Sequence, residues 1–163
     1  GKIEPGRSDH VCSTYDFLDT TAELAGVKPK KSTDGISLVP ELLGQGRQPE
    51  HSYLYWESGS ISPHAQAALT EGLYAYRPHP NKKIQLYDES QDPNWENDIA
   101  GDHPGMVEKV QNIFREAHTD SKWYVNPGET ESEVKKKRER AKKQGSLHKT
   151  TEPNSVYPTD PRS

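Results

Sequence analysis

The residues LYDESQDPNWENDIA, numbered 86–100, end a strand and turn the chain towards a helix. Asp88 and Asp92 can accept hydrogen bonds from nearby backbone N–H groups, as carboxylates do in tight turns. Pro93 fixes φ and removes a backbone donor, so a strand cannot continue through it. The stretch therefore predicts a strand that stops in a carboxylate-rich turn.

The composition is too polar for a large independent core. The chain has 163 residues, enough for one domain, but only 29% are apolar and the mean hydropathy is −1.07. Globular domains usually have about 45–50% apolar residues with glycine included, and glycine adds only 12 residues here. The core is therefore expected to be small, or part of the apolar surface to lie against a missing partner.

Charge and cysteine content exclude several classes of function. The net charge of −4 provides no global field for binding nucleic acids or membranes, and no apolar run approaches the roughly 20 residues of a membrane span. The single cysteine, Cys12, rules out an internal disulfide framework and a cysteine-based zinc site. Because the chain starts at Gly1 and its one methionine is Met106, a fragment or a cleaved product is the simplest interpretation.

Apolar spacing predicts helices at both ends of the first 118 residues. Residues 14–25 have apolar positions at helical spacing, and Gly26 suits the position after the end of the helix. A short buried helix is expected at about 40–44. Residues 104–118 form the clearest helix, because a proline suits its first turn and an apolar stripe follows. The face expected to be buried in the first helix comprises Tyr15, Leu18, Ala22 and Ala25.

The middle of the chain predicts three or four antiparallel strands. Residues 51–57 are rich in aromatics and are typical of a strand. Residues 65–70 and 73–77 suit two strands around the Glu71-Gly72 turn, and residues 83–87 suit the next. After residue 119 the composition changes: residues 131–144 are helix-prone with almost no apolar face, and residues 146–163 are expected to be disordered.

Several segments, in order, resemble the C-terminal part of the sulfatase family. Residues 86–100 resemble the family pattern L-Y-D-L-x-x-D-P-x-E-x-x-N-L-A, and residues 1–6 resemble G-K-I-x-P-G. Residues 16–26, 34–44 and 68–76 resemble D-x-x-P-T-x-x-x-L-A-G, D-G-x-S-L-x-x-x-L-x-G and A-x-R-x-G-x-x-K-x. Departures from these patterns occur at Asp19, Thr70, Ala75, Glu89 and Trp95.

The resemblance implies an α/β fold, with α+β structure within this fragment. Residues 1–50 would end the α/β catalytic domain, residues 51–118 would form a small antiparallel sheet packed by a C-terminal helix, and residues 119–163 would form a polar, partly basic, mostly disordered tail. The parent is expected to be exported, periplasmic or extracellular, or lysosomal. The expected partners are the missing N-terminal catalytic portion and a sulfated small molecule or glycan, with neither a membrane nor a nucleic acid.

The family hydrolyses sulfate esters with a formylglycine set in C/S-x-P-x-R and with calcium bound by oxygen ligands. Cys12 lacks the proline and arginine of that motif, and the paired metal-binding acids are not recognisable. The chain alone is therefore expected to be catalytically inert, with no catalytic or metal-binding residue. The histidines of the chain lack the spacing of a zinc site.

The small sheet is expected to lie beside the active-site mouth, where loops would contact substrate. Aromatic faces stack on sugar rings, and residues after a loop can reach a ligand. The ordinary alternatives are the core packing of a strand and a loop histidine without a role. The candidate substrate-binding residues are Tyr55, Trp56, Glu57, His64 and Gln66.

The sequence also fits two other interpretations, a polyanion-binding module and a remnant without a function. The basic cluster at 135–143 suits binding of a polyanion, although glutamates at four-residue spacing also suit a solvated helix. The departures from the family patterns also fit a degenerate remnant without a function. Salt-sensitive polyanion binding that is lost on deleting residues 131–144 would favour the non-catalytic binding module.

Overall fold

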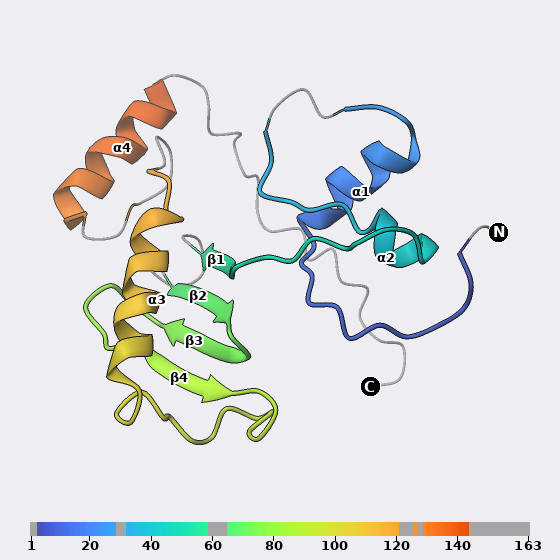
Figure 1. Cartoon of the computed structure of the whole chain (residues 1–163). Coiled ribbons are helices and arrows are strands. Elements are labelled where there is room, and N and C mark those ends of the chain that lie inside the picture. The colour runs from blue at the N-terminus through green and yellow to red at the C-terminus, as the bar shows by residue number, and fades with distance from the viewer. Residues whose placement is uncertain (1–2, 29–31, 59–64, 121–125, 127–128, 144–163) are drawn as a thin grey trace, which may run out of the picture.

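The computed structural model describes residues 3–28, 32–58, 65–120, 126 and 129–143. Two helices, α1 (Asp16–Leu24) and α2 (Val39–Leu43), lie together, and a separate four-stranded sheet carries α3 (Pro104–Glu116) on one face (Figure 1). This arrangement of helices beside a small antiparallel sheet confirms the α+β expectation.

The sheet is antiparallel throughout and its strands follow chain order. The β2–β3 hairpin has the predicted bounds, because Glu71 (φ 52°) and Gly72 (φ 76°) form a two-residue turn with positive φ at both positions. The first and last strands begin later than predicted. The strands are β1 (Leu54–Ser58), β2 (Ala65–Thr70), β3 (Leu73–Arg77) and β4 (Gln85–Asp88).

The core lies between α3 and one face of the sheet. Val110, Ile113 and Phe114, from the predicted apolar stripe of α3, are at most 5% exposed. They pack against the small or branched residues of the sheet, so the helix can approach the strands closely. The remaining buried members of this cluster are Ala68, Ala75, Ile84 and Leu86.

The turn after β4 has the carboxylate contacts that the sequence predicts. One oxygen of Asp88 accepts hydrogen bonds from the backbone N–H groups of Ser90 (2.9 Å) and Gln91 (3.3 Å). Asp92 accepts one from the backbone N–H of Asn97 at 2.8 Å. These bonds satisfy donors that would otherwise be left without partners where the strand ends, and they fix the path towards α3.

Trp95 closes this turn over the opposite face of the sheet. Its backbone has φ of 58°, an uncommon conformation for a bulky residue. The indole stacks on Tyr74 with ring centroids 4.2 Å apart and an interplanar angle of 11°. The ring of Tyr87 lies tilted at 6.4 Å. The residue that departs from the family pattern is therefore used in packing.

The helix α1 is found where it was predicted, but only part of the face expected to be buried is enclosed: Ala22 is 8% exposed, as predicted, whereas Leu18 is not buried. Leu18 is 57% exposed, and so is the apolar side chain beside it in sequence, Phe17, at 62%. Besides Ala22, the buried residues of the helix are the polar Asp16 and Thr20, at 0% and 4%. They are buried because they bond backbone groups of the following loop: Thr20 Oγ1 accepts from Leu38 N–H at 2.9 Å.

The short helix α2 forms as predicted but is not buried. None of its five residues is fully enclosed, and its end at Gly44 takes a positive φ of 61°. It contacts α1 rather than a wider core. Both helices therefore contribute little apolar burial within the described chain.

Asp16 ties α1 to the segment that leads into β1. Its carboxylate accepts hydrogen bonds from Ser13 N–H at 2.7 Å and Ile36 N–H at 2.8 Å, and it lies 2.9 Å from His51 Nε2. Burial alone would raise the pKa of Asp16, but these hydrogen bonds outweigh burial and lower it. The polar contact holds together two parts of the chain that share little apolar surface.

The predicted helix after residue 130 is present as α4 (Glu131–Lys143). It begins with a capping box, in which Thr130 N–H donates to Glu133 at 2.8 Å and Glu133 N–H donates to Thr130 Oγ1 at 3.4 Å. The predicted last residue of this helix, 144, and the segment 146–163 that is expected to be disordered lie outside the described residues. Within the described part, no helix combines the length and apolar character needed to cross a bilayer.

Candidate functional site

One end of the sheet aligns polar side chains across three strands. Glu57 on β1 pairs with Gln66 on β2, and Gln66 pairs with Arg77 on β3. Directly paired residues in an antiparallel sheet point to the same side, which here is the side that α3 covers. We call these three residues, together with Tyr55 and His118, the edge network.

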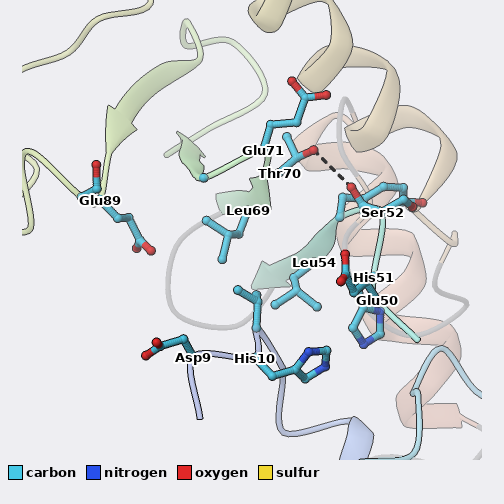
Figure 2. A pocket seen from close by; sticks show the side chains of 14 residues that line it. Asp9, His10, Glu50, His51, Ser52, Leu54, Leu69, Thr70, Glu71 and Glu89 are labelled. Carbon is cyan, nitrogen blue, oxygen red and sulfur yellow. Dashed lines mark hydrogen bonds between the residues drawn. The ribbon is translucent and has the colours of Figure 1, made fainter. Parts of the chain in front are cut away.

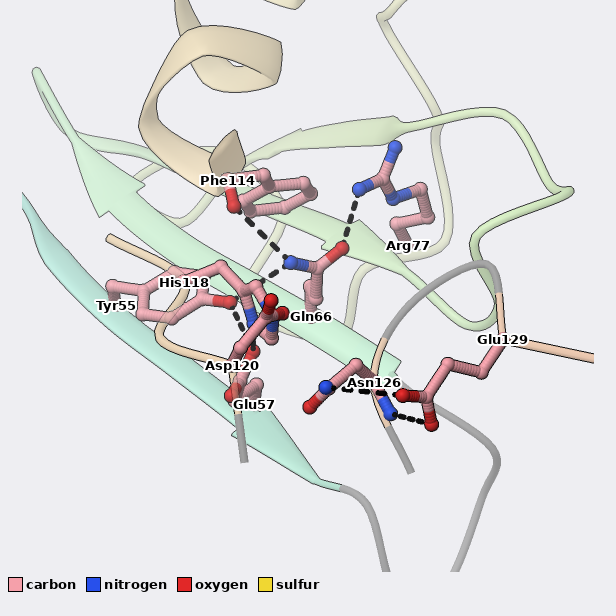
Figure 3. A network of polar contacts seen from close by, with 9 residues as sticks. All are labelled: Tyr55, Glu57, Gln66, Arg77, Phe114, His118, Asp120, Asn126 and Glu129. Carbon is pink, nitrogen blue, oxygen red and sulfur yellow. Dashed lines mark hydrogen bonds and ion pairs between the residues drawn. The ribbon is translucent and has the colours of Figure 1, made fainter. Parts of the chain in front are cut away.

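Hydrogen bonds connect the residues of the edge network, and each bond has a defined donor and acceptor (Figure 3). The Tyr55 hydroxyl donates to Glu57 Oε2 at 2.6 Å and accepts from Gln66 Nε2 at 2.8 Å. Gln66 Nε2 also lies 3.4 Å from the carbonyl oxygen of Phe114, so its Oε1 is free to accept from Arg77 Nη2. Gln66 is only 1% exposed, so its amide is held by protein groups alone.

His118 joins the edge network from beyond the end of α3. Its Nδ1 lies 2.8 Å from Glu57 Oε2 and its Nε2 lies 3.0 Å from Asp120 Oδ1. Burial favours the neutral ring, but the hydrogen bonds to the two carboxylates outweigh it and raise the pKa of His118. Glu57 is therefore held by a phenol and an imidazole at once.

The pKa values of Tyr55 and Arg77, at the two ends of the edge network, are also shifted. Burial, with a smaller contribution from the hydrogen bond to Glu57, raises the pKa of Tyr55, so its hydroxyl remains a donor. Burial lowers the pKa of Arg77. The guanidinium carbon lies 5.0 Å from the centroid of the Phe114 ring, a cation–π arrangement.

The structure brings together three of the five predicted site residues. Tyr55, Glu57 and Gln66 share the edge network, whereas Trp56 points to the opposite face, 37% exposed. His64 lies outside the described residues. The alternation of side chains along a strand separates Trp56 from its neighbours. Substrate contact by these residues remains a prediction.

Sequence reasoning missed Arg77, His118 and Phe114 as neighbours of the predicted residues. The available signal was the Glu71-Gly72 turn, because a two-residue hairpin fixes the register and places Gln66 opposite Arg77. No comparable local signal relates His118 to Glu57, which are 61 residues apart.

A hollow of about 510 Å³ opens near the other end of the sheet (Figure 2). Leu54 and Leu69 form part of its floor, and the N-terminal segment with His10 forms one wall. Its carboxylates would repel a sulfate ester, so this hollow suits an anionic substrate less well than the edge network does. The acidic residues that line it are Asp9, Glu50, Glu71 and Glu89.

No cluster of three or more histidine, cysteine or acidic side chains suited to a metal ion occurs among the described residues. Within the edge network Glu57 contacts His118, and Asp120 contacts the same imidazole from outside the network. The arrangement offers hydrogen-bonding groups to a ligand and a site of proton exchange at His118.

Comparison with known proteins gives partial matches only. No family model matches the chain. Arylsulfatase A from Bos taurus is 35% identical over 75 residues, which make up 45% of this chain and 15% of the relative. The chain therefore spans a small part of the length of this relative.

Solved structures share the fold. A 2-O GAG sulfatase superposes with a TM-score of 0.54 at 22% identity, covering 63% of this chain and 23% of that protein. The phosphonate monoester hydrolase of Agrobacterium radiobacter gives a TM-score of 0.55 at 18% identity, covering 67% and 25%. At these identities the structures support a common fold and do not distinguish between the two activities.

Proposed function

Because the chain is related to the sulfatases over a partial region, we propose that it forms the C-terminal, substrate-side region of a sulfuric ester hydrolase. The whole protein would hydrolyse sulfate esters, and the solved 2-O GAG sulfatase makes a sulfated carbohydrate the favoured substrate class. This region would contribute a docking surface and substrate contacts. The formylglycine and calcium of the family would be supplied by the catalytic part, since the C/S-x-P-x-R motif is absent from this sequence.

The exposed apolar face of α1 carries this proposal. Phe17, Leu18 and Leu24 are 62%, 57% and 53% exposed, although an amphipathic helix normally turns such residues inwards. Exposed apolar surface of this kind marks an interaction site. The partner that fits is the remainder of a sulfatase catalytic domain, because the matched relative has most of its length outside the aligned region.

The edge network supplies the substrate-side part of the proposal. It places a phenol, an amide, an imidazole and a guanidinium at one end of the sheet. Such groups recognise sugar hydroxyls and anionic substituents through directed hydrogen bonds. They do not include a group that would attack the sulfur atom.

A chimeric enzyme tests the docking role. In bovine arylsulfatase A, the whole chain would replace the corresponding region, and hydrolysis of 4-methylumbelliferyl sulfate would be measured with calcium present. We expect the chimera to fold and hydrolyse the ester, and the double variant F17S/L18S to lose secretion and activity. The matched control is E23S, because Glu23 is exposed on the same helix.

The same assay on the isolated chain tests the absence of a catalytic centre. We expect no hydrolysis above the buffer rate at any chain concentration. Hydrolysis by the isolated chain would overturn that part of the proposal, and an active F17S/L18S chimera would overturn the docking role.

A second function is favoured by one observation on α4. Lys135, Lys136 and Arg140 are exposed along this helix, a pattern that suits a polyanion. A polyanion-binding module would be retained on heparin–agarose, elute earlier as salt is raised, and lose retention when residues 131–144 are deleted. Retention that survives the deletion would exclude this function for α4.

A further inference from the structure

Among the residues that the structure describes, the edge network ends in a cation without an anionic partner. Arg77 donates to the side-chain oxygens of Gln66 and, at 3.4 Å, of Gln111, and both acceptors are neutral amides. Within the described residues, no carboxylate forms an ion pair with its guanidinium. Its Nε is buried and has no hydrogen-bond acceptor.

The nearest carboxylate of the edge network is already engaged. Glu57 Oε2 accepts from the Tyr55 hydroxyl at 2.6 Å and lies 2.8 Å from His118 Nδ1. When His118 is protonated, its charge opposes those of Glu57 and Asp120 together. That single positive charge cancels only one of the two negative charges, but among the described residues neither carboxylate forms an ion pair with the Arg77 guanidinium.

The position of the guanidinium is fixed from two sides. Gln66 cannot rotate its amide without losing the bonds to Tyr55 and to the Phe114 carbonyl, so its Oε1 stays directed at Arg77. The guanidinium carbon lies over the ring of Phe114, 1% exposed, 5.0 Å from the ring centroid. A cation held this way loses little freedom when a ligand binds, which favours affinity.

Burial of the cation without an anion costs free energy in the free protein. A partly buried charge is stabilised only when it is paired or well hydrogen-bonded. Two neutral acceptors and one aromatic ring leave several of the five guanidinium donors unused. A bound oxyanion would satisfy such donors with charge-assisted hydrogen bonds.

We infer that Arg77 binds an oxyanion of the ligand, either a sulfate group or a carboxylate on a sugar, at the end of the sheet formed by β1, β2 and β3. The inference rests on the proposed substrate-side function and assigns the residue that recognises negative charge. Gln66 acts as a positioning residue, because it orients the guanidinium and has no free donor directed outwards.

Nuclear magnetic resonance of the full chain tests this inference directly. The 15N–1H resonance of the Arg77 Nε–H would be followed during titration with sodium sulfate, sodium acetate and glucosamine 6-sulfate, with sodium chloride at equal ionic strength as the reference. We expect a saturable shift with at least one of the oxyanion probes and none with chloride. A shift with sulfate alone would identify a sulfate site, and a shift with acetate alone would identify a carboxylate site.

Variants show whether the shift reports Arg77 itself. R77Q should weaken binding, followed through the backbone resonances of β2 and β3, by about tenfold or more, since a charged hydrogen-bonding group is lost. R115Q is the control, because Arg115 is an exposed arginine on α3 whose bond to Asn112 is independent of the edge network. R77K, which keeps the charge, should bind more strongly than R77Q and verifies that the fold is intact.

The inference is overturned if no oxyanion probe gives a saturable shift, or if R77Q binds as the unchanged chain does. Either result can occur with an active chimeric enzyme, which would leave the sulfatase proposal standing. Conversely, oxyanion binding at Arg77 in a chain whose chimera folds without activity would support the site and reject the sulfatase function.

Discussion

Among single residues, Asp16 connects three separate segments of the chain. It is completely buried, yet its three partners come from the segment before α1, from the loop after it and from the approach to β1. A buried carboxylate with directed donors fixes geometry more strictly than an apolar contact does. The same residue explains why a helix can bury its polar side.

Replacement of Asp16 by asparagine should destabilise the chain by about 1–3 kcal/mol, because one carboxylate oxygen becomes an N–H₂ group facing a backbone donor. The native pKa of Asp16 is lowered, so its stabilisation is present above the ordinary value of 3.8 and is lost as pH falls below it. Urea unfolding of both proteins at pH 7 and pH 3 measures the difference, which should shrink at pH 3. An equal difference at both pH values would contradict this role.

His118 should give the opposite dependence on pH. Its pKa is raised in the folded chain, so its contribution is complete below the ordinary value of 6.5 and is lost as pH rises through the native pKa. The variant H118Q should therefore lose more unfolding free energy at pH 5.5 than at pH 8.5. Urea unfolding at the two pH values measures both losses, and a larger loss at pH 8.5 would show that the contacts to Glu57 and Asp120 are unimportant.

Gly35 has no room for a side chain. A Cβ atom would lie 2.5 Å from Asp19 Oδ2 and 2.6 Å from the carbonyl oxygen of Tyr15, and the second atom belongs to the backbone. We expect G35A to destabilise the chain by about 1–3 kcal/mol. Thermal unfolding measures it against G6A, because a Cβ at Gly6 meets no atom within 4 Å. Equal midpoints for the two variants would refute the close contact.

At the level of elements, α1 and α3 differ in how far their apolar residues are exposed to solvent. The apolar stripe of α3 is enclosed by the sheet, whereas Phe17, Leu18 and Leu24 of α1 are exposed. Both helices have the same kind of sequence pattern. They differ in what covers the apolar residues: the sheet covers those of α3, whereas α1 turns Asp16 and Thr20 towards the chain that packs on it.

This contrast predicts unequal effects of equally drastic substitutions. F114A should cost about 3–5 kcal/mol, because it opens a cavity under α3. F17S and L18S should each change the unfolding free energy of the isolated chain by less than about 0.5 kcal/mol, as surface substitutions do. Equilibrium unfolding in urea provides all three values. A loss at Phe17 comparable to that at Phe114 would mean that α1 is packed within the isolated chain.

The sequence predicted elements better than faces. The bounds of β2 and β3 were predicted without error because the Glu71-Gly72 turn allows only one register. The bounds of helix α3 were predicted to within two residues, since its apolar stripe lies within one short segment and the sheet that covers it immediately precedes it in the sequence. The buried side of α1 could not be predicted, because periodicity locates apolar residues and does not reveal whether anything covers them.

For the molecule as a whole, the exposed apolar side chains gather in its N-terminal part. Val11, Phe17, Leu18, Leu24 and Val27 are each more than half exposed. Monomeric soluble proteins rarely expose large contiguous apolar patches. The first 28 residues are therefore the part of the chain whose surface least resembles that of an independent domain.

We expect the isolated chain to self-associate as its concentration is raised. Sedimentation velocity over a hundredfold concentration range should show an increasing weight-average mass, and F17S/L18S should shift this rise to higher concentration. Raised salt should not reverse the association, because apolar contact is not screened. A chain that stays monomeric throughout, with and without the substitutions, would show that the exposed face of α1 does not drive association.

The candidate site was only partly predictable at this scale. Tyr55, Glu57 and Gln66 follow from strand positions, and the hairpin register then adds Arg77. His118 depends on where α3 ends relative to β1, which is a property of the packed molecule. Long-range polar contacts of this kind have no periodic signature in the sequence.

The stacking of Trp95 on Tyr74 also has an optical consequence. Two aromatic chromophores 4.2 Å apart and nearly parallel couple their electronic transitions, which should give an intense near-ultraviolet circular dichroism band. The part of that band that is lost on replacing Trp95 reports the packing of the turn after β4 on β3, whereas the far-ultraviolet signal reports the helices. The chain therefore contains its own spectroscopic marker, by which opening of this one turn can be timed separately from unfolding of the rest.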